Sequence, residues 1–223
     1  MPFGGGMENP VNSGGRPFHV AWSDSVTLGM GRQTPTGLHL SDMDVRTSSQ
    51  RNILDLPDSV VNYATALPDG WAWIPASGDK IIVKRAGKTR EYPKPPSNSF
   101  LFEVRADASG NRIFYTGPDA ATGGDSLTYG VLSLDNGTFT RWGAFTAEFG
   151  DITPLADGSV FIDASQSQGS LTFFKATGPG QLQSLGVSPR PLRSVSVSTD
   201  MKRASASERD YRADAWMSKV VTH

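Results

Sequence analysis

Carboxylates at short turns are the side chains of this sequence with the most evident capacity for chemistry. Four aspartates stand at predicted hairpin turns: Asp69, Asp107, Asp157 and Asp200. Two carboxyl groups about 5–10 Å apart, one of them with a raised pKa, would suit glycoside hydrolysis. An aspartate at a turn, however, usually accepts hydrogen bonds from its own local backbone. We therefore predict structural roles for these four residues, and likewise for Asp163 and Asp214.

Other reactive side chains are scarce. The chain has no cysteine and three histidines. The lack of cysteine excludes disulfides, thiolate metal sites and cysteine nucleophiles, and three histidines leave little room for a histidine metal site. The glycine runs at 4–6 and 14–15 lack the Lys-Ser/Thr pair of a phosphate loop. We predict no catalytic residue, no metal site, no cofactor and no enzymatic activity.

A basic segment at residues 79–94 is a candidate docking surface. It holds six basic residues against two acidic ones, a local charge of +4. The residues proposed to contact an acidic protein surface or anionic lipid headgroups are Lys80, Lys84, Arg85, Lys88 and Arg90. The alternative is a solvated sheet edge whose lysines block strand addition. Nucleic acid is not an expected partner, because the whole chain has a formal charge of −1 and only Tyr92 lies among these charges.

Two tryptophans and an N-terminal arm complete the candidate partner-binding residues. Trp71 and Trp73 are two positions apart, so they point to one face of a strand. They either pack in the core between sheets or anchor an interface. Residues 1–17 form a Gly-rich arm that cannot bury itself and would become ordered on a neighbouring subunit. The contacting residues of this arm would be Met1, Pro2, Phe3, Met7 and Arg16.

Short strands must position all of these residues, because helical periodicity is hard to find. Stretches rich in Val, Ile, Thr, Phe, Tyr and Trp are bounded by Gly, Pro, Asp, Asn and Ser clusters. Five hairpins share one plan, with turn markers at Asp24, Asp69, Ser109, Asp157 and Asp200. The markers are 45, 40, 48 and 43 residues apart. A period of roughly 40–45 residues with four strands per unit is typical of the blades of a β-propeller.

The predicted fold is therefore all-β and propeller-like over residues 18–221, with about five four-stranded units. The fifth unit lacks its outer strand, so the propeller would be incomplete or open. Residues 7–12 would close it by lending a strand, although Pro10 suits only an edge. A two-sheet β-sandwich is the alternative, because it shares the short-strand pattern.

Residues 191–221 contain the most specific motif of the sequence. The segment Ser194-Val-Ser-Val-Ser-Thr-Asp200 leads through a turn into a second strand, and Asp214-Ala-Trp216 opens a third. This segment resembles the repeat of TolB-like and WD40-like propellers, such as those of some bacterial serine/threonine kinases. The sequence departs from the pattern at Met201, where these repeats usually have glycine. The kinase domain has no counterpart, since the glycine-rich loop and the His-Arg-Asp element are missing. The resemblance implies a bacterial propeller protein that binds other molecules.

Residues 1–18 have no basic region followed by an apolar stretch, and no run approaches the roughly 18 apolar residues that span a bilayer. We expect a soluble or membrane-extrinsic protein, cytoplasmic by default and periplasmic if a signal peptide has been removed. The leading functional hypothesis is a non-catalytic scaffold subunit of a larger assembly, for example a respiratory or photosynthetic membrane complex. It would dock through its arm and blade edges.

The alternative function is the sensing of a ligand or peptide in the central channel of the propeller. Polar side chains that converge on the channel would favour this hypothesis, and an apolar plug would count against it. A glycoside hydrolase is the least favoured function, because it requires a pair of carboxylates that faces a cleft.

Overall fold

The structure is a computed structural model and describes residues 17–22, 27–34, 37–44, 46–57, 63–165, 170–188, 192–202, 204–208 and 217–221. This part of the chain forms nineteen strands and contains no helix. It therefore has no helix long and apolar enough to cross a membrane. The candidate arm residues Met1, Pro2, Phe3, Met7 and Arg16, and the proposed closing segment 7–12, lie outside the described residues.

The strands form five sheets that follow one another along the chain. The first sheet contains β1 (Pro17–Trp22), β2 (Thr27–Thr34), β3 (Gly37–Asp44) and β4 (Ser49–Leu56). The second contains β5 (Tyr63–Leu67), β6 (Gly70–Ile74), β7 (Lys80–Arg85) and β8 (Lys88–Pro93). The third contains β9 (Glu103–Ala106), β10 (Arg112–Pro118), β11 (Leu127–Ser133) and β12 (Thr138–Phe145).

The fourth sheet contains β13 (Phe149–Pro154), β14 (Val160–Ser165), β15 (Leu171–Gly178) and β16 (Gln181–Val187). The fifth contains β17 (Leu192–Val197), β18 (Ala204–Glu208) and β19 (Met217–Val221), three strands among the described residues. Every strand pairs antiparallel with the next strand of its sheet, for example β5 with β6 and β9 with β10. Each sheet is thus an up-and-down meander.

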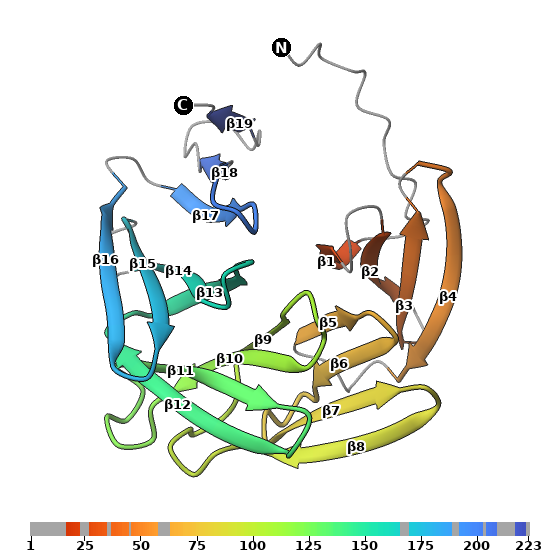
Figure 1. Cartoon of the computed structure of the whole chain (residues 1–223), viewed down its shortest axis with the longest axis horizontal. Helices are drawn as coiled ribbons and strands as arrows, with labels where there is room; N and C mark the ends of the chain where they lie inside the picture. Colours follow the sequence, from red (N-terminus) through yellow and green to blue (C-terminus); the bar gives the residue numbers. More distant parts are fainter. Residues whose placement is uncertain are drawn as a thin grey trace.

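The five sheets are arranged radially around a common centre (Figure 1). Their first strands, β1, β5, β9, β13 and β17, lie innermost, and β4, β8, β12 and β16 lie at the rim. Consecutive inner strands contact one another, from β1 to β5, β9, β13 and β17. In Figure 1 the first and fifth sheets lie at the two ends of an open arc. The predicted propeller-like architecture is confirmed, and the alternative of a two-sheet sandwich is not what the chain forms.

Apolar side chains fill the spaces between neighbouring sheets. Leu38, Leu40 and Trp71 belong to a buried cluster between the first and second sheets. Ile81 and Tyr115 belong to a second cluster, between the second and third sheets. A third cluster joins the third sheet to the fourth. Burial of one such large side chain stabilises a fold by about 1.5–3 kcal/mol, so these clusters hold the radial stack together.

Three of the four turn aspartates accept hydrogen bonds from nearby backbone N–H groups, as the sequence predicts. Asp157 accepts the Ser159 backbone N–H at 3.0 Å, and Asp200 accepts the Lys202 N–H at 3.1 Å. Asp107 accepts the backbone N–H of Arg112 at 3.3 Å. These carboxylates stabilise the turns by bonding local backbone, as predicted. Asp69 differs, because it pairs with the Arg85 side chain across the sheet.

Two strands have irregular features. The pairing of β3 with β4 shifts between Leu40 and Ser41, because Ile53 of β4 has no opposite residue, and β3 continues through this bulge. β9 begins at Glu103, and the apolar residues just before it are not part of the strand. Residues 99–102 instead bond the loop and strand ends around them, such as Leu101 N–H to the Gly78 carbonyl at 2.7 Å.

Candidate interaction site at the centre of the sheets

Three aromatic side chains lie at the beginnings of three consecutive inner strands. Tyr63 begins β5, Phe102 immediately precedes β9, and Phe149 begins β13. The Tyr63 and Phe102 ring centroids are 5.9 Å apart, and those of Phe102 and Phe149 are 5.8 Å apart. Phe149 is 57% exposed, although it is a large apolar residue. We call these three residues the aromatic row.

The ion pair between Arg105 and Glu103 packs against Tyr63, the first ring of the aromatic row. The Arg105 guanidinium lies over the Tyr63 ring, 5.4 Å from its centroid. Its Nη2 is 2.9 Å from Oε1 of Glu103, a carboxylate with no exposed surface. Glu103 Oε2 accepts the backbone N–H of Ile152 on β13 at 3.0 Å. One buried side chain therefore links the third sheet to the fourth and also holds the arginine under Tyr63.

Two aspartates extend this polar group into the fourth sheet. Asp151 on β13 lies directly opposite Asp163 on β14. Asp163 is 3% exposed, and its Oδ2 accepts the backbone N–H of Val195 on β17 at 2.8 Å. Asp163 therefore links the fourth sheet to the fifth in the way that Glu103 links the third to the fourth.

Burial shifts the protonation equilibria of these groups. The pKa of Asp163 is raised to about 7, mainly by burial and secondly by the nearby Asp151 charge. Burial also raises the pKa of Glu103 well above its usual range, against the opposing effect of Arg105. The pKa of Tyr63 is raised by burial and then by the charges of Glu103 and Asp151. The Asp151 charge acts on Tyr63, Glu103 and Asp163, so these ionisable side chains interact with one another at the centre of the sheets.

The site divides into a buried polar part and an exposed aromatic part. Glu103 and Asp163 are buried and bonded to the backbone of the next sheet, so their carboxylates serve to connect sheets. Thr65 does the same between the second and third sheets, where its Oγ1 accepts the Ala106 N–H at 3.1 Å. In the aromatic row, Phe149 is exposed, and Tyr63 and Phe102 are half-buried. Within the described ranges, no group of three or more His, Asp or Glu residues is arranged to hold a metal ion.

The structure places both candidate tryptophans in the core. Trp71 is 1% exposed and Trp73 5% exposed, and both belong to the cluster between the first and second sheets. This placement corresponds to the core-packing interpretation of the pair. Neither residue offers an exposed anchor to a partner in this arrangement.

The basic segment is divided between two faces of the second sheet. Lys80 and Lys84 alternate with residues of the opposite face and share their face with Ile82, which packs toward the first sheet. Lys80 Nζ bonds Glu91 at 2.8 Å on this face. The pleat of the strand thus separates these two lysines from the rest of the segment.

The other basic side chains face the third sheet. Arg85 lies opposite Lys88, and Arg90 lies opposite Val83, which packs between the second and third sheets. Arg85 Nε is 2.6 Å from Asp69 Oδ1, and its Nη1 donates to the Gly110 carbonyl at 2.9 Å. The five candidates therefore do not form a single patch.

Sequence reasoning missed the aromatic row and the charged residues beneath it. A signal was present, because Tyr63, Phe102 and Phe149 recur at intervals of 39 and 47 residues, close to the period of the sheets. Each stands at the beginning of the first strand of its unit. Residues that recur in this way at the start of inner strands meet around the centre of a radial fold.

No protein-family model matches the sequence, and no curated protein matches it either. Solved structures resemble the fold over most of the chain. TolB from Acinetobacter baumannii superposes with a TM-score of 0.67 at 15% identity, over 93% of this chain and 52% of TolB. The β-propeller domain of Cps50 (Swd1) from Myceliophteria thermophila superposes with a TM-score of 0.54 at 13% identity, over 86% and 79% of the two chains.

A peptidase also resembles the chain in fold. Acylaminoacyl peptidase from Pyrococcus horikoshii superposes with a TM-score of 0.56 at 9% identity, over 92% of this chain and 38% of the peptidase. The chain thus spans about half the length of TolB and less of the peptidase. At these identities the likeness establishes the fold alone. It confirms the expected resemblance to TolB-like and WD40-like proteins: the chain is a β-propeller similar to those of TolB and of Cps50.

Proposed function

We propose that this propeller is a non-catalytic protein-interaction domain that binds a polypeptide segment at the aromatic row. The observation that carries the proposal is Phe149, which is 57% exposed and continues a row of rings with Phe102 and Tyr63. An exposed aromatic side chain that is held in place by other rings is a common anchor for a partner. The ion pair of Arg105 with Glu103 fixes Tyr63 from below, so the row is preorganised.

The convergent polar groups at the centre favour polypeptide binding at the channel over an apolar plug. Asp151 is half-buried beside the row, and its charge acts on Tyr63, Glu103 and Asp163. A backbone N–H group or side-chain donor of a bound segment would find an acceptor in the half-buried Asp151 carboxylate. We also propose that the protein is a subunit of a larger assembly. It would contact other subunits through the arm of residues 1–17 and through the face of the second sheet that carries Lys88 and Arg90. An acidic partner surface fits that face, and anionic lipid headgroups share this chemistry.

A non-catalytic role agrees with the burial and hydrogen bonding of the central carboxylates, Glu103 and Asp163. Glycoside hydrolysis needs two carboxyl groups that reach the substrate. Glu103 has no exposed surface and Asp163 is 3% exposed, and each accepts a hydrogen bond from the next sheet. The peptidase likeness concerns the fold and carries no catalytic residue to this chain.

Comparative capture of partners from an extract of the source organism tests the proposal. Immobilised wild-type protein, Phe149→Ser and Leu185→Ser would be compared by quantitative mass spectrometry. Leu185 on β16 is 42% exposed at the rim, so its substitution is a matched control for a lost apolar surface. We expect proteins that the wild type and Leu185→Ser retain and that Phe149→Ser loses. The same proteins retained by all three baits would contradict binding at the aromatic row.

A further inference from the structure

Asp151 lies beside the exposed ring of the aromatic row. It follows Phe149 by two positions on β13, so both side chains lie on the same face of this strand. Phe149 is 57% exposed, and Asp151 is half-buried. The Tyr63 hydroxyl donates a hydrogen bond to the Asp151 side chain, which places this carboxylate next to the first ring of the row as well. A segment that covers Phe149 therefore comes close to the Asp151 carboxylate.

The charges around Asp151 are mostly negative. No basic side chain among the described residues forms an ion pair with Asp151. The Arg105 guanidinium pairs with Glu103 at 2.9 Å. The residue directly opposite Asp151 on β14 is Asp163, and like charges in this position repel each other. Three carboxyl groups thus act on one another here, with the charge of one guanidinium to offset them.

The centre of the sheets already contains one arginine between a ring and a carboxylate. The Arg105 guanidinium lies 5.4 Å from the Tyr63 ring centroid and pairs with Glu103. A planar guanidinium suits both contacts, because its flat face stacks on a ring while the N–H groups at its edge bond a carboxylate. Phe149 and Asp151 offer the same two kinds of group, and no described cation pairs with this carboxylate.

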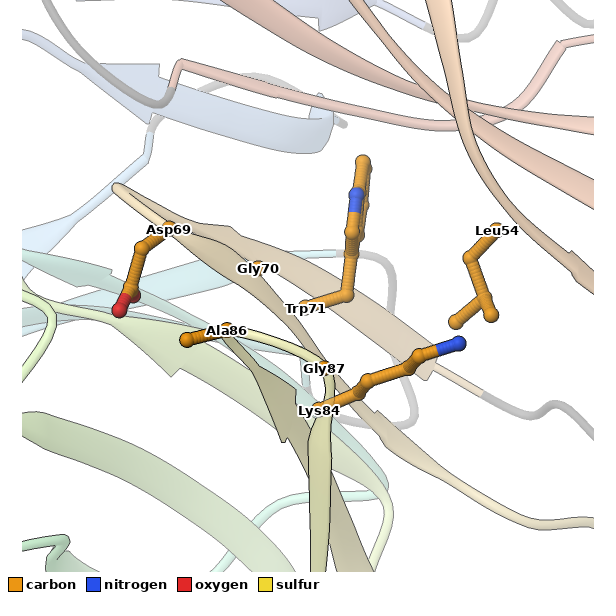
Figure 2. Close-up of a pocket in the computed structure, with 7 residues that line it drawn as sticks. All are labelled: Leu54, Asp69, Gly70, Trp71, Lys84, Ala86 and Gly87. Carbon is orange, nitrogen blue, oxygen red and sulfur yellow. The ribbon is translucent and has the colours of Figure 1, made fainter.

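A pocket elsewhere in the molecule differs from this region in charge. It has a volume of about 180 Å³ and lies at the end of the second sheet away from Tyr63 (Figure 2). Figure 2 shows Asp69 and Lys84 in its wall. Asp69 Oδ1 is 2.6 Å from Arg85 Nε, so the carboxylate of this pocket already has a counter-charge. Of these two places, only the centre of the sheets has a carboxylate that pairs with no described cation.

We propose that the polypeptide segment bound at the aromatic row carries an arginine, whose guanidinium stacks on Phe149 and pairs with Asp151. This inference rests on the proposed function, since it names the chemistry of the same ligand. An acidic residue at this point of the segment would be repelled by the central carboxyl groups, and a neutral residue would leave Asp151 without a counter-charge. Phe149 thus contributes affinity through its apolar area, and Asp151 contributes selectivity for a positive charge.

Peptides selected from a random library displayed on phage are the probes that test this inference. The wild-type protein would be the bait, and the enriched sequences would be compared with the unselected library. We expect arginine to be enriched. The best binders would then be synthesised with citrulline in place of arginine, which keeps the shape of the side chain and removes its charge. Titration calorimetry would measure the affinity of both forms of each peptide for the wild type and for Asp151→Asn.

The two substitutions form a double-mutant cycle that reports direct contact. We expect citrulline in the peptide and Asp151→Asn in the protein each to weaken binding by about tenfold, and the two together to weaken it by little more, because both remove the same ion pair. Asp135→Asn is the matched control, since it changes the net charge equally. Asp135 is exposed in the turn between β11 and β12, at the end of the third sheet away from Phe102. We expect its affinities to stay within about twofold of wild type.

Phe149→Ser separates this inference from the proposed function. Peptides that bind Phe149→Ser more weakly, but show no enrichment of arginine or bind Asp151→Asn as tightly as the wild type, would overturn the arginine contact and leave the proposed function standing. Independent, additive losses in the cycle would also overturn it, because they would mean that the arginine and Asp151 do not touch. Peptides that bind Phe149→Ser as tightly as the wild type would overturn both proposals.

Discussion

At the scale of single residues, Asp163 couples the stability of the propeller to pH. Its pKa rises from 3.8 to about 7 in the folded protein, because burial and the Asp151 charge disfavour the ionised form. The folded protein thus binds this proton more tightly than the unfolded chain does. The free energy of unfolding therefore falls as the pH rises from about 4 to about 7, by up to about 4 kcal/mol.

Asp163→Asn tests this coupling with little change in structure. The amide oxygen of asparagine still accepts the Val195 N–H, but the residue no longer binds a proton in this range. We expect the loss of stability between pH 5 and pH 8, measured by urea unfolding, to become clearly smaller in the variant. Glu103, whose pKa is also raised, leaves a residual slope of the same sign. A variant with the pH dependence of the wild type would contradict this role of Asp163.

Trp71 gives a second prediction at this scale. Because it is 1% exposed between the first and second sheets, Trp71→Ala should lower the free energy of unfolding by about 3–5 kcal/mol. Phe149→Ser is the exposed counterpart and should change it by about 1 kcal/mol or less. Denaturant unfolding of both variants at one pH measures the difference. A loss of less than about 1 kcal/mol in Trp71→Ala would contradict the placement of this tryptophan in the core.

At the scale of strands, the β6–β7 ladder depends on the absence of a side chain at Gly70. Alanine there would place its Cβ 1.9 Å from the Lys84 carbonyl oxygen, and two backbone segments would have to separate. We expect Gly70→Ala to destabilise the fold by about 3 kcal/mol or more. At Gly87 a Cβ meets no atom within 4 Å, so Gly87→Ala has only the cost of its positive φ, about 1–3 kcal/mol. Thermal or denaturant unfolding ranks the two variants, and the opposite order would contradict the observed packing.

The strands themselves were largely predictable from local sequence. Apolar segments such as Ile81–Val83, together with turn residues such as Asp157 and Gly158, specify hairpins through short-range physics. The face of the sheet on which a side chain lies was harder to predict from local sequence. Lys84 and Arg85 are adjacent in one basic segment, yet the pleat directs them toward different sheets. That assignment depends on which neighbouring residues pack inward, and packing is a tertiary property.

The candidate site was not predicted, because it is assembled from separate sheets. Glu103 bonds a backbone group 49 residues away, and Asp163 bonds one 32 residues away. No local spacing reveals such pairs. The aromatic row was the part open to prediction, since its residues recur with the period of the sheets.

At the scale of the whole molecule, the propeller is a series of sheets in which each packs on the next in sequence. Apolar clusters join the first four sheets, and buried side-chain acceptors bridge the second to the third, the third to the fourth and the fourth to the fifth. This arrangement fixes the inner strands, and the inner strands present Tyr63, Phe102 and Phe149 together. The fold thereby provides a rigid support for an exposed aromatic surface.

Selection of peptide ligands from a random display library, followed by measurement of their affinity for purified variants, tests polypeptide recognition at this surface most directly. We predict that selected peptides bind Phe149→Ser at least tenfold more weakly than the wild type and bind Leu185→Ser with unchanged affinity. Phe149 and Leu185 are both exposed, so the two substitutions remove comparable apolar surface at different places. Peptides that bind Phe149→Ser as tightly as the wild type, or a library that yields no specific ligand, would contradict the account.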